Sequence, residues 1–139
     1  MSAFEYRHVI GFEETNLVGN VYYTNYLLWQ GRCRETFLYE KAPEILEQIK
    51  DGLHLVTTHC SCEYFTELKA FDEIEIHMTL KGVQQERIDL DFEYWRGTDG
   101  QKQLVARGGQ QIACILPDGS RAIPDILRSA LEPYATTPS

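Results

Sequence analysis

No stretch of this sequence approaches the roughly 20 consecutive apolar residues that span a bilayer. Residues 1–16 contain neither the apolar segment nor the cleavage site of a secretory signal. Basic residues are few, with 13 Lys and Arg against 21 Asp and Glu, and the net charge of −8 repels phosphate backbones. We therefore expect a cytoplasmic protein that binds neither membranes nor nucleic acid.

The sequence also lacks several short motifs that mark enzyme classes. It has no GxSxG elbow, no P-loop and no GxGxxG turn, which argues against the α/β-hydrolase and nucleotide-binding solutions. The four cysteines of a cytoplasmic chain are expected to be reduced thiols. Within His59-Cys60-Ser61-Cys62, strand alternation turns the two cysteines away from His59, so the three ligands do not converge. We predict no metal site and no cofactor.

What the sequence does contain fits a single domain over residues 1–139. Apolar residues make up 43% and charged residues 24%, as in globular proteins, and no linker or repeat is visible. Residues 4–11 alternate like a strand, and residues 12–20 are typical of a loop. Residues 21–42 are apolar around most of a helical circumference, which predicts a long buried helix. Gly31 within this helix predicts the close approach of another backbone or of a partner helix.

After Pro43 ends that helix, residues 44–52 predict a short amphipathic helix. The remainder is rich in β-branched and aromatic residues, with strands expected within 54–68, 72–86, 87–97 and 101–119. Turn signals at 97–100 and 117–119 suggest an antiparallel meander. Residues 123–134 predict a short helix begun by Pro124, followed by a frayed tail over 136–139.

A single helix that is apolar nearly all round cannot bury its whole circumference in one protomer. The economical arrangement is an α+β domain in which an antiparallel sheet curls around the long central helix. A second copy of the chain would cover what remains exposed. We therefore expect a homo-oligomer, a dimer that pairs into a tetramer.

The segment from Glu14 to Tyr26, ETNLVGNVYYTNY, carries a recognisable pattern. It resembles the D-x-D-x-x-G-x-V-x-Y-x-x-Y motif of hotdog-fold thioesterases of the 4-hydroxybenzoyl-CoA type, in which a loop leads from the first strand into the central helix. The order of elements fits this family over most of the chain. The resemblance implies a single hotdog domain that hydrolyses acyl thioesters.

One position departs from that motif, because Asn16 stands where the family has its catalytic carboxylate. An amide cannot act as a general base. Together with Arg34 in the helix, this asparagine resembles the smaller group of enediyne-pathway thioesterases, which work without a catalytic acid. The resemblance implies release of a long polyunsaturated β-ketoacyl chain from the phosphopantetheinylated carrier domain of an iterative polyketide synthase.

By the same resemblance, the catalytic candidates are Asn16, Arg34 and the backbone amide of Tyr23. Asn16 would orient water or the thioester, and the Tyr23 amide at the helix start would face the carbonyl oxygen. Arg34 is a permanent cation that would stabilise an oxyanion or enolate. The substrate-binding candidates, which would shape an apolar acyl channel, are Gly19, Tyr26, Trp29, Cys60 and Cys62.

Two other interpretations stay open at this point. The protein would be an ordinary acyl-CoA thioesterase if Glu13, Glu14 or Glu35 supplied a carboxylate. It would be a catalytically silent acyl-binding module if the missing acid were not replaced. Asn16 also suits a simple turn, and Arg34 suits a structural ion pair with one of these glutamates.

Overall fold

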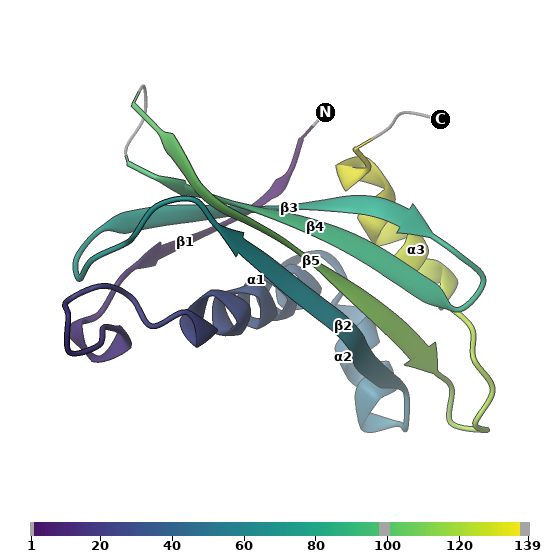
Figure 1. Cartoon of the computed structure of the whole chain (residues 1–139). Helices are drawn as coiled ribbons and strands as arrows, with labels where there is room; N and C mark the ends of the chain where they lie inside the picture. Colours follow the sequence, from purple (N-terminus) through teal and green to yellow (C-terminus); the bar gives the residue numbers. More distant parts are fainter. Residues whose placement is uncertain (1, 98–100, 137–139) are drawn as a thin grey trace.

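The computed structural model describes residues 2–97 and 101–136, in which one curved antiparallel sheet lies over a long helix (Figure 1). The five strands lie in the order β1-β3-β4-β5-β2. Among the described residues the strands are β1 (Phe4–Val9), β2 (His54–Tyr64), β3 (Glu73–Val83), β4 (Arg87–Arg96) and β5 (Gln103–Ile115). The helices are α1 (Thr24–Lys41), α2 (Pro43–Lys50) and α3 (Asp125–Leu131), with 3-10 turns at Phe12–Glu14 and Glu132–Tyr134.

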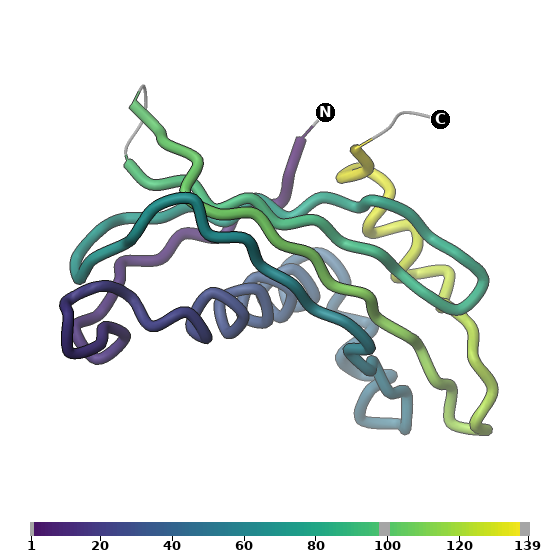
Figure 2. The backbone as a smooth tube through the Cα atoms, viewed as in Figure 1, coloured from purple at the N-terminus to yellow at the C-terminus, as the bar shows by residue number. Residues whose placement is uncertain are grey.

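The strand order corrects the simple meander predicted above. Strands β3, β4 and β5 do follow one another as antiparallel neighbours, but β2 pairs with β5 at the far edge and β1 pairs with β3. The chain leaves β1, runs under the sheet along α1 and α2, and enters β2 at the opposite edge (Figure 2). An 18-residue helix spans about 27 Å, so it carries the chain across the width of the sheet.

Alternation along the strands builds the core, as expected. On β4 the four apolar positions Ile88, Leu90, Phe92 and Tyr94 are buried, while the residues between them are partly exposed. From α1 the side chains of Trp29, Cys33 and Phe37 fill the space beneath the sheet. These layers fix the positions of the groups on the inner side of α1.

The central helix differs from the prediction in three respects. It begins at Thr24 instead of Val21, because residues 20 and 21 bridge to Lys69 and Thr15 in extended backbone. It is buried on one side only, with Leu28 and Tyr39 being 51% and 74% exposed. Gly31 has no atom within 4 Å of where a Cβ would lie, so no backbone of the described protomer approaches it, and its contact with a partner helix stays a prediction.

The described residues cover only part of what was predicted for the 97–100 turn and for the C-terminal segment. Asp125–Leu131 forms the expected helix after Pro124. The predicted turn at 97–100 and the predicted tail at 136–139 fall largely on residues 98–100 and 137–139, which lie outside the described residues. Within the described ranges, no helix has the length and apolar character needed to cross a membrane.

Candidate active site

Asn16 lies in an exposed turn between the first 3-10 turn and α1. Its Oδ1 accepts a hydrogen bond from the Val18 amide at 3.0 Å, and its carbonyl accepts one from the Gly19 amide at 3.0 Å. Gly19 has φ +89°, a conformation that residues with a Cβ rarely adopt. The turn therefore occupies one lone pair of the Asn16 amide, while Nδ2 has no acceptor among the described residues and is free to donate.

The start of α1 offers further donors. The Tyr22 amide donates to the Glu14 carbonyl at 3.0 Å, whereas the Tyr23 and Thr24 amides have no acceptor within the described part of the chain. The first amides of a helix carry partial positive charge and suit a developing oxyanion. The Tyr23 amide is therefore available as a donor, and its catalytic role stays a prediction.

Beside these amides lies a cleft of about 290 Å³, which we call the tyrosine cleft. The Tyr64 hydroxyl donates to the Tyr23 carbonyl at 3.2 Å, and the rings of Tyr26 and Tyr64 meet edge to face at 4.7 Å. The tyrosine cleft is lined by Asn20, Val21, Tyr23, Tyr26, Tyr64, Phe65, Thr66 and Glu67. Of the predicted substrate-binding residues, Tyr26 lines this cleft.

Tyr26, Tyr64 and the neighbouring Cys62 are held neutral. Burial, with a smaller contribution from Cys62, raises the pKa of Tyr26 well above its usual range. Burial is also the largest cause that raises the pKa of Tyr64 to about 12 and that of Cys62 to about 11. At neutral pH the tyrosines keep their protons and Cys62 is a thiol, so none of them is an anionic nucleophile.

Glu14 is not a free carboxylate. Its Oε1 accepts hydrogen bonds from His8 Nε2 and the Gly11 amide, both at 2.8 Å, and its Oε2 accepts one from Trp29 Nε1 at 2.7 Å. Burial would raise the pKa of this carboxyl, but the hydrogen bonds from Gly11, His8 and Trp29 together lower it. Its carbonyl accepts from Asn25 Nδ2 at 2.8 Å as well. Glu14 therefore ties the Asn16 loop to β1 and α1.

This hydrogen-bond network bears on two predicted roles, that of Trp29 in substrate binding and that of Glu14 as a general base. Trp29 is fully buried and donates to Glu14, so it belongs to the core and does not line the tyrosine cleft. Both oxygens of Glu14 accept hydrogen bonds from inside the protein, which argues against a role as general base, although no finding tests that role directly. Glu13 and Glu35 are exposed side chains.

Arg34 lies further along α1, against β2 and β5. Its Nη1 donates to Thr57 Oγ1 at 2.9 Å and to Gln110 Oε1 at 3.0 Å. It makes no ion pair with Glu13, Glu14 or Glu35 in the described protomer, and burial lowers the pKa of its guanidinium while Glu35 opposes that shift. Its side chain also borders a small apolar cavity of about 20 Å³ beneath the sheet. The predicted ion pair is thus replaced by neutral acceptors.

The structure does not bring all predicted residues together. Tyr23 and Arg34 are eleven positions apart, which is about 16 Å along a helix. Cys62 lies beside the ring of Tyr26, whereas Cys60 is exposed on the edge strand. Thr57 and Gln110, which hold Arg34, carried no sequence signal, because pairing across strands is not visible along the chain.

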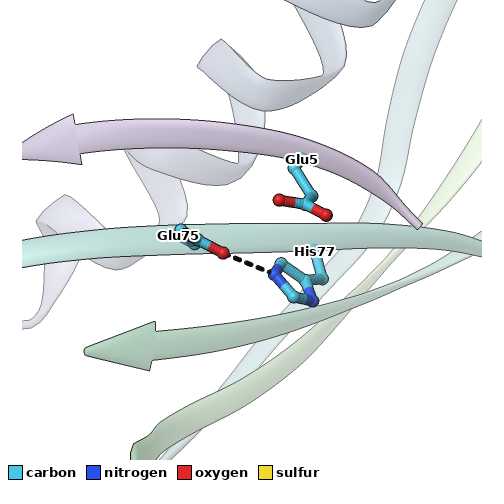
Figure 3. A group of neighbouring side chains, drawn as sticks. All are labelled: Glu5, Glu75 and His77. Carbon is cyan, nitrogen blue, oxygen red and sulfur yellow. Dashed lines mark hydrogen bonds and ion pairs between the residues drawn. The ribbon is translucent and has the colours of Figure 1, made fainter. Parts of the chain in front are cut away.

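One cluster on β1 and β3 has the composition of a metal site. Glu5, Glu75 and His77 place ligand atoms within 4.8 Å of one another (Figure 3). However, Glu75 already accepts from Lys102 Nζ at 2.8 Å and from His77 Nε2 at 3.0 Å, and Arg7 Nη2 lies 3.5 Å from its other oxygen. The hydrogen bonds from Lys102 and His77 lower the pKa of Glu75. The cluster is therefore a balanced ion-pair network. His59 lies on the outer side of the sheet with Ser61, away from Cys62.

The comparisons with known proteins agree with this architecture. The family model of the thioesterase-like superfamily matches residues 10–131. A protein of Aquifex aeolicus strain VF5 that is inferred to be an esterase is 31% identical over 91 residues, 66% of this chain and 70% of that protein.

Among solved structures, the dynemicin thioesterase, studied for polyene binding, is similar with a TM-score of 0.91 and 43% identity, covering 98% of this chain and 99% of that one. A 1,4-dihydroxy-2-naphthoyl-CoA thioesterase from Synechocystis has a TM-score of 0.83 at 23% identity, covering 93% and 95%, a likeness of fold. The family model's match over residues 10–131 includes the Asn16 loop, the central helix and the four strands β2 to β5. The chain therefore belongs to the thioesterase-like superfamily and is a hotdog-fold thioester hydrolase.

Proposed function

We propose that this thioesterase hydrolyses a long polyunsaturated β-ketoacyl chain from the phosphopantetheinyl arm of a polyketide synthase carrier domain. The observation that carries the proposal is the loss of the motif's carboxylate at position 16. Asn16 replaces the carboxylate, and Glu14 already accepts three hydrogen bonds from His8, Gly11 and Trp29. The likeness to a dynemicin thioesterase studied with polyene supports the same substrate class.

The groups that remain support hydrolysis by charge stabilisation. Water adds to the thioester carbonyl carbon, and the carbonyl oxygen takes up negative charge. The carbon–sulfur bond then breaks, and the released thiolate accepts the proton that the attacking water loses. The Tyr23 amide and Asn16 Nδ2 donate toward the carbonyl oxygen or the attacking water. Arg34 stabilises the oxyanion or the enolate form of the β-ketoacyl group. A thiol leaves readily, so little general-acid assistance is needed.

The 16 Å between the helix start and Arg34 implies that one protomer does not hold the complete site. Strand β2 is an edge strand, and Leu28 on α1 is half exposed, so surfaces next to Arg34 remain open to a second copy. In a dimer paired along β2, Arg34 of one protomer would approach Asn16 of the partner subunit. We include this composite site in the proposal.

Subunit complementation tests the composite site. Asn16→Ala and Arg34→Ala are each expected to be nearly inactive, and mixing them by unfolding and refolding makes half of the dimers hybrid. Each hybrid keeps one intact site, so about a quarter of wild-type activity should return. If refolding restores wild-type dimers but no activity returns from the mixture, the site lies within one protomer.

Substrate preference tests the proposed function itself. Rates should be compared on acetyl-CoA, palmitoyl-CoA and a conjugated polyene β-ketoacyl pantetheine thioester, by measuring free thiol. Because each buried CH₂ contributes about 0.8 kcal/mol, kcat/KM should rise at least a hundredfold from acetyl to the long chains, and should be highest for the polyene. Equal rates on all three would contradict the proposal. Hydrolysis of none, by either the wild type or Asn16→Asp, would favour an acyl-binding module.

A further inference from the structure

Three side chains and one backbone carbonyl form a continuous chain of hydrogen bonds beneath the sheet. Gln30 Nε2 on α1 donates to the Ser61 carbonyl on β2 at 3.0 Å. Gln110 Nε2 on β5 donates to Gln30 Oε1 at 3.2 Å, and Arg34 Nη1 donates to Gln110 Oε1 at 3.0 Å. Gln30 is fully buried and Gln110 is 6% exposed. We call this chain the amide relay.

The direction of the amide relay is fixed at its first member. A carbonyl oxygen can only accept, so the Ser61 carbonyl requires that Gln30 present its NH₂ group there and its oxygen to Gln110. Gln110 must then donate with its own NH₂ group, which leaves its oxygen facing Arg34. A flip of either amide would set two donors or two acceptors against each other in a buried place, where an unmade hydrogen bond is costly.

Gly108 on β5 leaves room for this arrangement. A Cβ at this position would collide with Gln30 Nε2 and with the Ser61 carbonyl oxygen, the two atoms that form the first bond of the relay. The next residue, Gly109, would meet only ordinary or slightly tight neighbours, the nearest being the Leu90 carbonyl at 3.3 Å. Gly108 therefore leaves the space in which the buried side-chain amide of Gln30 reaches the Ser61 carbonyl on β2.

The end of the relay determines what Arg34 offers to a substrate. Gln110 and Thr57 together take both hydrogens of Nη1, which fixes the plane of the guanidinium. In the described protomer, Nε and Nη2 have no hydrogen-bond acceptor. We infer that Gln30 and Gln110 are positioning residues that hold the Arg34 guanidinium in its working orientation. This inference rests on the proposed role of Arg34 in thioester hydrolysis.

Activity on palmitoyl-CoA, measured as release of free CoA, tests the relay. Gln110→Met keeps the volume of the side chain and removes the acceptor of Arg34, so kcat should fall about tenfold with KM little changed. Gln30→Met leaves Gln110 in place but unoriented, so the fall should be smaller and in the same direction. Gln111→Met is the matched control, because neighbouring residues on a strand face opposite sides and this change should leave kcat unaltered.

Melting temperatures of the same preparations separate positioning from loss of fold. If Gln110→Met does not fold, Gln30→Met carries the test. Folded variants of both Gln110 and Gln30 with wild-type kcat would overturn the inference.

A double-mutant cycle with Arg34→Ala distinguishes this inference from the proposed function. If the relay acts through Arg34, Gln110→Met should cause no further loss of kcat in the Arg34→Ala background. If Arg34→Ala lowers kcat and the effect of Gln110→Met is simply additive, the inference fails and the role of Arg34 stands. If Arg34→Ala leaves kcat unchanged, the proposed role of Arg34 fails, and the inference fails with it.

Discussion

Two partly buried charged groups lie against α1, Glu14 near its start and Arg34 in its middle, and the protein holds them differently. Near the start, the Glu14 carboxylate accepts three hydrogen bonds, and both of its oxygens are occupied. In the middle, the Arg34 guanidinium donates twice through one nitrogen only. A group whose hydrogen bonds are all made within the protein serves structure, whereas a group held on one side keeps donors for a ligand.

The Arg34 region has a feature that a direct ion pair would have removed. Both Arg34 acceptors are neutral, so no carboxylate is hydrogen-bonded to it in the described protomer. Electrostatic stabilisation of a transition state depends on such a fixed charge in a poorly hydrated site. Substitutions at Arg34 and at Glu14 test the two regions in turn.

The largest effect is expected from Arg34→Ala, which should lower kcat on palmitoyl-CoA by roughly 10²–10³ with little change in KM. Arg34→Lys should recover part of the loss, because it restores the charge but not the planar fork. Arg32→Ala, an exposed arginine on the same helix, is the control. Activity and melting temperature are measured on one preparation. A folded Arg34→Ala protein with near wild-type kcat would remove Arg34 from the mechanism.

At the start of the helix, Glu14→Gln should cost about 2–3 kcal/mol in the free energy of unfolding. It replaces an oxygen that accepts from a buried donor with an NH₂ group, leaving Trp29 Nε1 or the His8–Gly11 pair without an acceptor. Urea denaturation measures the loss, and the exposed neighbour in Glu13→Gln should show almost none. Equal stability of the two variants would mean that the Glu14 network is dispensable.

A smaller loss of stability, about 1–3 kcal/mol, is expected for Gly108→Ala, because the new methyl group displaces Gln30 or the β2 backbone. Gly109→Ala should be milder, since its nearest contact is 3.3 Å. Urea denaturation compares the two variants. Gly108→Ala should also lower kcat if Gln30 helps to orient Arg34. A greater loss in Gly109→Ala would contradict the close packing at Gly108.

The smallest effect concerns pH. The pKa of Glu14 in the folded protein lies below its ordinary value of 4.5, so its contribution to stability is complete above that pH. The contribution is lost as the pH falls through the lowered value. The difference in unfolding free energy between the wild type and Glu14→Gln should therefore shrink below pH 4.5. A constant difference down to pH 3 would contradict the lowered pKa.

Local pattern was enough to predict much of the fold. The alternation of Ile88, Leu90, Phe92 and Tyr94 identified β4 and its buried face. The motif around Asn16 identified the family, and Pro43 marked the end of α1. Strand order was not predictable in the same way, because hairpin signals report neighbours along the chain and α1 carries β2 past three strands.

The candidate site was harder to predict from the sequence, for a related reason. Tyr26, Gln30 and Arg34 are spaced four residues apart, which places them on one helix face, and all three lie toward β2 and β5. What each one contacts depends on register between strands, which placed Gln110 opposite Cys60. The hydrogen bond from Trp29 to Glu14 was not predictable, because an indole on an apolar helix gives no sign that its N–H has a carboxylate partner.

Strand β2 ends the sheet with eleven residues that have a neighbour on one side only. If a second copy completes this edge, folding and pairing become one equilibrium, and the melting temperature should rise with protein concentration. Dilution would then expose an open edge, which is a template for irregular association between chains. Thr57 lies on this strand and accepts a hydrogen bond from Arg34. Substitution of Thr57 would then alter subunit association as well as the proposed contribution of Arg34 to catalysis.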